Sequence, residues 1–206
     1  MSDFRTAQES FWAGSFGSDY VARNRSEALV AGKTALWSTV LRRAQRPTSA
    51  AELGANIGLN LIALRRLFPE LGLAGVEINP DAHAELARIP GIAATHGSLL
   101  DWTPTAPADL AFTCGVLIHL DPAVLAQAYD RLVAASRRYV AVVEYYNPTP
   151  VEIPYRGHAG RLFKRDFAGE LLDRHPGLRV VDYGFCWRRD PNWPLDDLTW
   201  FLLEKR

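Results

Sequence analysis

The sequence contains little cysteine and no long apolar run. Cys114 and Cys186 are too few for a disulfide framework or a cysteine-based zinc site, and they fit a reducing compartment. No run approaches the ~18 apolar residues of a membrane-spanning helix. The first residues, MSDFRTAQESFW, lack the basic and then apolar pattern of a secretion signal. These absences predict a cytoplasmic protein without a membrane partner and without a metal centre.

An excess of either charge is also missing. The chain has 23 basic and 23 acidic residues, so its formal net charge is zero. A protein that covers nucleic acid broadly needs clustered Lys and Arg. The balance therefore argues against a nucleic-acid partner, although it leaves room for a local basic cleft.

What is present is enough for one compact domain. The 206 residues are 48% hydrophobic, which supports a core without disulfide or metal support. Residues 1–46 predict a helical cap with breaks around Gly14 and Gly17. Within it, apolar residues at helical spacing predict one helix over Ser26–Arg43, which Pro47 ends.

From residue 49 onward the pattern changes to alternating strands and helices. Strands separated by helices predict an α/β fold with a mostly parallel sheet and helices on both faces. We expect the last two strands to form an antiparallel pair, which makes seven strands in all. The predicted strands are Ala50–Leu53, Leu73–Ile78, Ile92–Thr95, Asp109–Thr113, Tyr139–Glu144, Leu178–Phe185 and Leu198–Leu203, and the predicted helices between them are Gly58–Phe68, Pro80–Arg88, Pro122–Ala135 and Phe167–Arg174.

One segment interrupts this alternation. Residues 145–165, YYNPTPVEIPYRGHAGRLFKR, are rich in proline, glycine and aromatic side chains and are too long for a simple connection. Loops beyond the carboxyl ends of strands carry the ligand chemistry of open α/β sheets. We therefore interpret the segment as a substrate-binding insertion, with a structural excursion packed on the sheet as the alternative.

The first chemical motif is AELGANIGLN, residues 51–60. It predicts a strand, a glycine-containing turn and a helix, an arrangement that brings backbone N–H groups to a ligand. It is not the dinucleotide fingerprint, because Asn56 and Leu59 occupy glycine-equivalent positions. Glu52 would repel a pyrophosphate and would suit a cationic ligand that carries an ammonium group. An ordinary strand–turn–helix is the alternative.

The second motif is GVEINP, residues 75–80, which ends the second strand. A carboxylate at Glu77 can accept hydrogen bonds from both hydroxyls of a ribose, as in other nucleotide-binding α/β folds. Ile78 would then lie against an adenine ring. The alternative is a strand-end acid that faces water.

Two further loops follow the third and fourth strands. In HGSLLDW, residues 96–102, Ser98 and the Leu99 backbone could bind a base edge, with Asp101 as the alternative partner. In FTCGVLIHLDP, residues 112–122, Gly115 allows close approach to a ligand. His119 can hold or lose a proton near neutral pH, which suits a catalytic base, or it can simply pack beneath the ligand.

Taken together, these motifs resemble class I S-adenosylmethionine-dependent methyltransferases. More narrowly, the chain resembles the pseudaminic acid biosynthesis-associated methylases. The matching segments are QESFWAGSFGSDYVARN (8–24), ELGANIGLN, FTCGVLIHL, EYYNPTPVEIPYRGH (144–158), LFKRDFAGELL (162–172) and DYGFCWRRDPNWPLDDLTWFLLEK (182–205). One departure concerns the acid that usually follows Gly97, because Ser98 occupies its place and shifts the expected base contact to the Leu99 backbone.

The resemblance implies a Rossmann-like sandwich that binds S-adenosylmethionine. The residues expected at this cofactor are Tyr20, Arg23, Asn24, Glu52, Gly54, Ala55, Asn56, Gly58, Glu77, Ile78, Ser98, Leu99, Cys114 and Gly115. Arg23 or Arg25 would pair with the methionine carboxylate.

The expected reaction is methyl transfer to an N or O atom of a small polar metabolite, with His119 and Tyr146 as candidate bases. The residues expected at the acceptor are Tyr145, Tyr155, Arg156, His158 and Lys164. Two alternatives remain open. One is a nicotinamide-dependent oxidoreductase, disfavoured by Glu52 and the missing third glycine, and the other is a non-catalytic cofactor-binding partner subunit. The sequence leaves the acceptor open, as well as the choice between monomer and homodimer.

Overall fold

The computed structural model of the chain describes residues 4–23 and 26–206. The strands are β1 (Ser49–Leu53), β2 (Gly72–Glu77), β3 (Ile92–His96), β4 (Ala108–Cys114), β5 (Ser136–Glu144), β6 (Val151–Glu152), β7 (Phe163–Lys164), β8 (Leu178–Phe185) and β9 (Thr199–Lys205). The helices are α1 (Ala7–Ala13), α2 (Ser15–Arg23), α3 (Glu27–Val40), α4 (Leu59–Leu67), α5 (Pro80–Ala87), α6 (Leu125–Ala134) and α7 (Phe167–Arg174), with short 3-10 turns at Leu117–His119 and Pro122–Val124.

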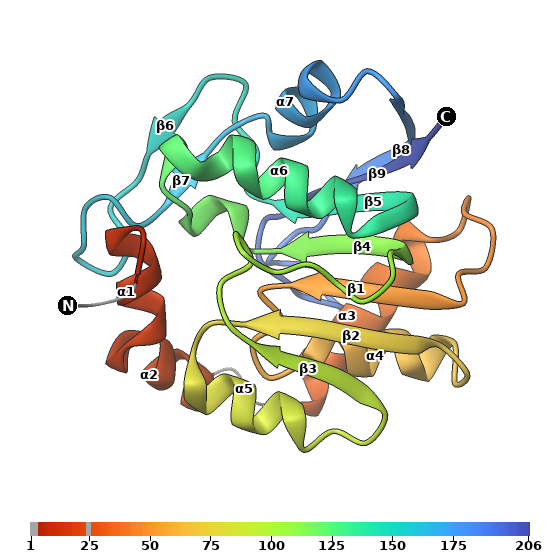
Figure 1. The fold of residues 1–206 in the computed structure, drawn as a ribbon, viewed down its shortest axis with the longest axis horizontal. Helices are drawn as coiled ribbons and strands as arrows, with labels where there is room; N and C mark the ends of the chain where they lie inside the picture. The colour runs from red at the N-terminus through yellow and green to blue at the C-terminus, as the bar shows by residue number, and fades with distance from the viewer. Residues whose placement is uncertain (1–3, 24–25) are drawn as a thin grey trace.

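A seven-stranded sheet organises the molecule in the order β3-β2-β1-β4-β5-β9-β8 (Figure 1). The first five strands are parallel to one another, and β9 runs antiparallel to both β5 and β8. The predicted α/β class, the seven strands and the antiparallel last strand are therefore confirmed. Because β1 and β4 lie side by side in the middle of the sheet, the chain reverses direction across it there, and ligands of open α/β sheets bind at this switch point.

Helices cover both faces of the sheet. On one face, Trp37 of α3 and Leu61 and Leu64 of α4 are fully buried in one apolar cluster. On the other face, Leu132 of α6 and Leu171 of α7 are fully buried in a second cluster. Each fully buried leucine contributes roughly 1.5–3 kcal/mol to folding, so these two layers fix the sheet and the loops at its ends.

The N-terminal cap is helical, as predicted, and contains the three helices α1, α2 and α3. The break at Gly14 is confirmed, but Gly17 lies inside α2. Ser26 caps α3, whose last helical residue is Val40, so the predicted end at Arg43 was three residues too long. Figure 1 shows α1 and α2 lying across the carboxyl ends of the parallel strands. Within residues 4–23 and 26–206, no helix combines the length and apolar character needed to cross a bilayer.

The predicted insertion is a folded excursion. Its strands β6 and β7 pair as a small antiparallel ribbon. A parallel bridge joins Tyr146 to Arg165, and a tight turn joins Tyr155 to His158. The segment lies at the same edge of the sheet as α1 (Figure 1).

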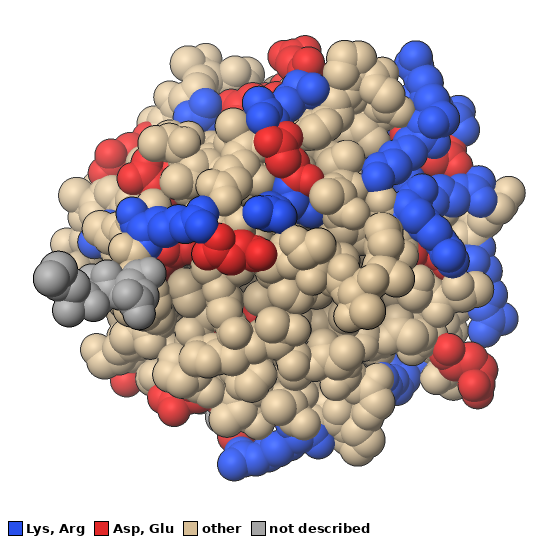
Figure 2. Space-filling model, in the orientation of Figure 1, with Lys and Arg blue, Asp and Glu red and all other residues tan. Residues whose placement is uncertain are grey.

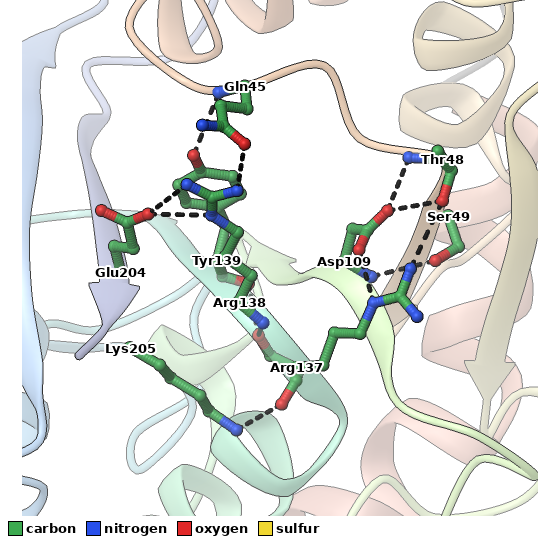
Figure 3. Close-up of polar contacts among 10 residues, drawn as sticks. Gln45, Thr48, Ser49, Asp109, Arg137, Arg138, Tyr139, Glu204 and Lys205 are labelled. Atoms are coloured by element: carbon green, nitrogen blue, oxygen red, sulfur yellow. Dashed lines mark hydrogen bonds and ion pairs between the residues drawn. The ribbon is translucent and has the colours of Figure 1, made fainter.

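At the opposite edge, where β4 and β5 begin, Figure 3 shows separate groups of polar side chains joined by hydrogen bonds and ion pairs. Asp109 accepts hydrogen bonds from the Thr48 backbone N–H at 2.7 Å and from Arg137 Nε at 2.6 Å. Glu204 accepts one from Arg138 Nε at 2.8 Å and pairs with Arg179. Figure 2 shows Lys and Arg side chains gathered on the side of the molecule where the C-terminus lies in Figure 1.

Candidate functional site

A cleft opens at the carboxyl ends of the parallel strands, beneath α1 and α2. It encloses about 870 Å³ of space that is free of atoms and partly open to solvent. Of the residues predicted from the sequence, those that line it are Tyr20, Gly54, Asn56, Glu77, Ile78, Ser98, Leu99, Cys114, Gly115 and His119. They come from the ends of β1, β2, β3 and β4 and from α2. The structure thus brings together, at one place, the motifs that lie far apart in the sequence.

The turn after β1 is built around glycines. Gly54 has a φ of +77°, and the N–H groups of Gly54 and Ala55 both donate to the Val76 carbonyl at 2.9 Å. A Cβ at Gly54 would lie 2.7 Å from Val116 Cγ2, and one at Gly58 would lie 2.7 Å from Leu86 Cδ1. These two glycines therefore allow tight packing within the protein. Ala55 and Gly58 are absent from the described cleft lining.

Glu77 lies at the end of β2, as predicted, with 8% of its surface exposed. Its carboxylate accepts hydrogen bonds from the backbone N–H groups of Asn56 and Asn79, both at 2.7 Å. Burial raises the pKa of Glu77, and the two backbone donors partly offset that effect. The carboxylate is thus fixed in the cleft by the backbone before any ligand arrives.

Glu52 lies beneath the cleft rather than in its lining. It is 1% exposed, and its Oε1 accepts a hydrogen bond from Asn60 Nδ2 at 2.6 Å. Lys33 Nζ donates to Asn60 Oδ1 at 3.0 Å, which completes a short polar chain. Burial raises the pKa of Glu52 to about 8. Glu52 Oε2 has no hydrogen-bond partner among the described residues.

The loop after β4 combines an open glycine with a buried anchor. Gly115 has a φ of +68°, and no atom lies within 4 Å of where its Cβ would stand. Glu144, at the end of β5, accepts hydrogen bonds from the backbone N–H groups of Val116 at 3.0 Å and Leu117 at 3.2 Å. Burial raises the pKa of Glu144 to about 7. Glu144 was not among the site residues predicted from the sequence, where its only signal is an acid at the end of an otherwise apolar strand.

His119 lines the cleft but does not titrate as the sequence suggested. Its Nδ1 donates to the Arg161 carbonyl at 2.6 Å, and its ring centroid lies 4.5 Å from that of Trp12 and 5.0 Å from that of Tyr155. Burial lowers the pKa of His119 to about 4. The expectation of proton exchange near neutral pH was therefore wrong. The ring is neutral at pH 7 with its proton on Nδ1, so Nε2 is an unprotonated acceptor.

Helix α1 contributes three lining residues that the sequence analysis missed: Gln8, Glu9 and Trp12. Gln8 Nε2 donates to the Gly160 carbonyl at 3.0 Å, which fixes the orientation of the amide. Gln8 Oε1 and Trp12 Nε1 are buried without a hydrogen-bond partner among the described residues. The spacing of Gln8 and Trp12 by four residues places them on one helix face, a signal that was available in the sequence.

No family model and no curated protein sequence matches the chain. Among solved structures, a mitomycin 7-O-methyltransferase superposes with a TM-score of 0.69 at 16% identity, covering 98% of this chain and 61% of that one. The chain thus spans less than two thirds of the length of that enzyme.

Two further structures match over nearly their whole length. A 1,6-didemethyltoxoflavin N1-methyltransferase from Burkholderia thailandensis, with bound S-adenosylhomocysteine, has a TM-score of 0.68 at 20% identity and covers 99% of this chain and 93% of that one. A magnesium protoporphyrin IX methyltransferase from Synechocystis PCC 6803, with bound S-adenosylmethionine, has a TM-score of 0.69 at 11% identity and covers 100% of both chains. The chain has the class I methyltransferase fold.

Residues 145–165 lie at the rim of the cleft, where Tyr155 contacts His119. None of the predicted acceptor residues is in the described lining. Tyr155 packs beside His119, and the His158 ring centroid lies 5.0 Å from that of Phe11. Arg156, with a φ of +50°, is exposed in the turn between them.

The remaining predicted residues are likewise absent from the described cleft lining. Lys164 Nζ lies 5.1 Å from the ring centroid of Tyr145. Tyr146 is 43% exposed and bridges to Arg165. The side chain of Arg23, together with Asn24 and Arg25, falls outside the described residues.

Proposed function

We propose that this chain is a methyltransferase that uses S-adenosylmethionine and acts on an N or O atom of a small polar metabolite. The observation that carries the proposal is the carboxylate of Glu77, which the backbone holds in the cleft at the end of β2. A carboxylate at this place can accept both hydroxyls of a ribose. Ile78 would contact the adenine ring, and the Leu99 backbone would bind the base edge.

The cleft fits the methionine part of the ligand as well. The open space beside Gly115, which a Cβ would fill, leaves room for a ligand against the backbone. The formally charged side chains in the described lining are Glu9 and Glu77, both carboxylates. Such a lining favours a ligand that carries a sulfonium and an ammonium group. The Asn56 turn, Cys114 and Tyr20 would then surround the amino-acid end.

When bound, S-adenosylmethionine supplies an electrophilic methyl group. The chain contributes alignment, exclusion of water by α1 and α2, and a proton acceptor. His119 is the better candidate for that acceptor, because its Nδ1 is held by the Arg161 carbonyl and its Nε2 is unprotonated at neutral pH. Tyr146 keeps a weaker claim, because it lies outside the cleft lining.

The acceptor side is proposed at the rim formed by residues 145–165, where Tyr155 and His158 meet the aromatic side chains of α1 and α2. One structural neighbour is named as an O-methyltransferase and another as an N1-methyltransferase, which supports leaving both acceptor atoms open. The narrower likeness to pseudaminic acid biosynthesis-associated methylases stays part of this proposal and rests on the sequence motifs. Both cysteines are free, which supports a cytoplasmic setting.

A thermal-shift panel followed by a transfer assay tests the proposal. S-adenosylhomocysteine should raise the melting temperature, whereas NAD should leave it unchanged. Labelled S-adenosylmethionine incubated with small hydroxylated and amino-bearing metabolites should then transfer its label. Stabilisation by NAD alone would refute the methyltransferase assignment. Stabilisation by S-adenosylhomocysteine with no transfer across such a panel would support a non-catalytic binding subunit instead.

A further inference from the structure

Glu9 is a buried carboxylate in the cleft that comes from the N-terminal cap rather than from the sheet. It is 7% exposed and lines the cleft. The Ser98 hydroxyl donates to its Oε1, and the Arg5 backbone N–H donates to its Oε2 at 2.8 Å. An ion pair between Arg5 and Asp101 holds the start of the cap against the loop after β3.

The hydrogen bonds of Ser98 limit what Ser98 itself can do. Its single hydroxyl proton is given to Glu9, and its oxygen accepts the Leu100 backbone N–H at 3.1 Å. A hydroxyl has one donor and two acceptor positions, so Ser98 has no second proton for a ligand. A carboxylate has about four acceptor positions, and the two donors found here occupy two of them. Glu9 therefore retains the capacity to accept further hydrogen bonds, and Ser98 orients it.

Glu9 also lies on the side of the cleft where a base would extend. The ends of β2 and β3 are adjacent, since the Gly97 N–H donates to the Glu77 carbonyl at 2.9 Å. A nucleoside whose ribose binds the Glu77 carboxylate and whose base crosses Ile78 would run toward Ser98. The Glu9 carboxylate, hydrogen-bonded to Ser98, stands at that end. An acceptor-only group there complements the exocyclic amino group of adenine, which is a donor.

We propose that Glu9 is a specificity-determining residue that accepts a hydrogen bond from the adenine amino group, so that α1 reads the base together with the Leu99 backbone of the loop after β3. This inference rests on the proposed function, because it requires an adenosyl ligand. It assigns the cap a role in ligand recognition as well as in covering the cleft. It also makes a chemical distinction, because hypoxanthine carries a carbonyl oxygen in place of the amino group and would face Glu9 acceptor to acceptor.

The test compares two ligands by calorimetric titration: S-adenosylhomocysteine and its deaminated analogue S-inosylhomocysteine. The wild type should bind the adenosyl ligand at least about tenfold more tightly, the size expected for a hydrogen bond to a charged group. Glu9→Gln should weaken the adenosyl ligand, should leave or improve the inosyl ligand, and should thus reduce the preference about tenfold. Glu27→Gln, the same substitution at an exposed carboxylate of α3 that lies outside the described cleft lining, is the matched control and should keep the preference.

The outcomes separate this inference from the proposed function. A preference that is unchanged in Glu9→Gln, or a parallel loss of both ligands, would overturn the role of Glu9 while leaving the methyltransferase proposal intact. A wild type that binds neither ligand would contradict the proposed function itself. If circular dichroism shows that Glu9→Gln is unfolded, Glu9→Asp decides by the same ratio. The aspartate side chain is one methylene shorter, so its carboxylate lies further from the base. A reduced preference for the adenosyl ligand supports the inference, and an unchanged preference overturns it.

Discussion

The carboxylates at the two ends of the strands differ in their surroundings and in the direction of their pKa shifts. Where β4 and β5 begin, Asp109 and Glu204 are each paired with an arginine, and these pairs lower the pKa of both acids (Figure 3). Where the strands end, Glu52, Glu77 and Glu144 are buried, and burial raises the pKa of each. Among the described residues, backbone N–H groups and the Asn60 amide donate to these acids, and no arginine does.

This difference fits our proposal that the carboxyl end binds a ligand, whereas the acids at the starting end serve stability. Ion pairs at the starting end satisfy their acids within the protein. At the carboxyl end, hydrogen bonds hold the acids in place, and their carboxylate oxygens can still accept hydrogen bonds from a ligand. Polar atoms of Glu52, Gln8 and Trp12 have no hydrogen-bond partner among the described residues. Burying polar groups in this way costs stability, and functional sites are where proteins tolerate that cost.

The largest effect is expected when one acid is removed at each end of the strands and the two variants are compared for ligand affinity. Glu77→Ala should weaken binding of S-adenosylhomocysteine at least about tenfold, because a charge-assisted contact to the ribose is lost. Asp109→Asn, at the other end, should leave that affinity unchanged. Calorimetric titration of both variants measures the contrast. Equal affinities in the wild type and in Glu77→Ala would remove Glu77 from the binding site.

A second prediction compares two glycines with similar backbone geometry. Gly115 and Gly157 have φ values of +68° and +84°, and no atom lies within 4 Å of the Cβ position at either one. Alanine at either site should therefore cost a similar amount of stability, of the order of 1 kcal/mol. Only Gly115→Ala places a methyl group in the cleft, so only that variant should lose affinity for S-adenosylhomocysteine, by several-fold or more. Matched affinities in the two variants would show that the space beside Gly115 is not used.

A third prediction concerns the pH dependence of stability at the carboxyl end. Burial raises the pKa of Glu52 to about 8, so its stabilising contribution is present below the unfolded value near 4.3 and is lost as pH rises toward 8. Glu52→Gln cannot ionise. Its free energy of unfolding relative to that of the wild type, measured by chemical denaturation, should therefore rise between about pH 5 and pH 8 and then level off, by an amount of the order of a few kcal/mol. A difference that is flat over this range would contradict the raised pKa.

The smallest effect is expected where the strands begin. There the contribution of the acid to stability depends on pH in the opposite direction. Asp109 has a lowered pKa because of Arg137 and Thr48, so its contribution is present above the unfolded value near 3.9 and fades as pH falls below it. Asp109→Asn should lower stability by about 1 kcal/mol or less at pH 7, the range of exposed pairs. Thermal melts should show this loss shrinking at about pH 3 and in high salt. A loss that grows in acid would contradict the ion-pair account.

The succession of strands and helices along the chain and the strand-end residues followed from the sequence because both depend on short-range patterns. Apolar runs separated by helices predicted the sheet, and acids or glycines at strand ends predicted Glu77 and Gly115. The contacts of α1 were missed because Glu9 and Ser98 are 89 positions apart, and helical spacing alone does not show which loop a helix covers. The burial of Glu52 under Asn60 and the lowered pKa of His119 likewise depend on packing between distant segments.

The central claim is that an adenosyl ligand binds at the carboxyl end of the sheet. Hydrogen exchange measured by mass spectrometry, with and without saturating S-adenosylhomocysteine, tests it most directly. We expect added protection in α1, in the turn around Gly54, and in the loops that follow Glu77, His96 and Cys114. The segments around Thr48, Arg137 and Glu204 should be unchanged. Protection confined to that second set, or absent throughout at saturating ligand, would contradict the account.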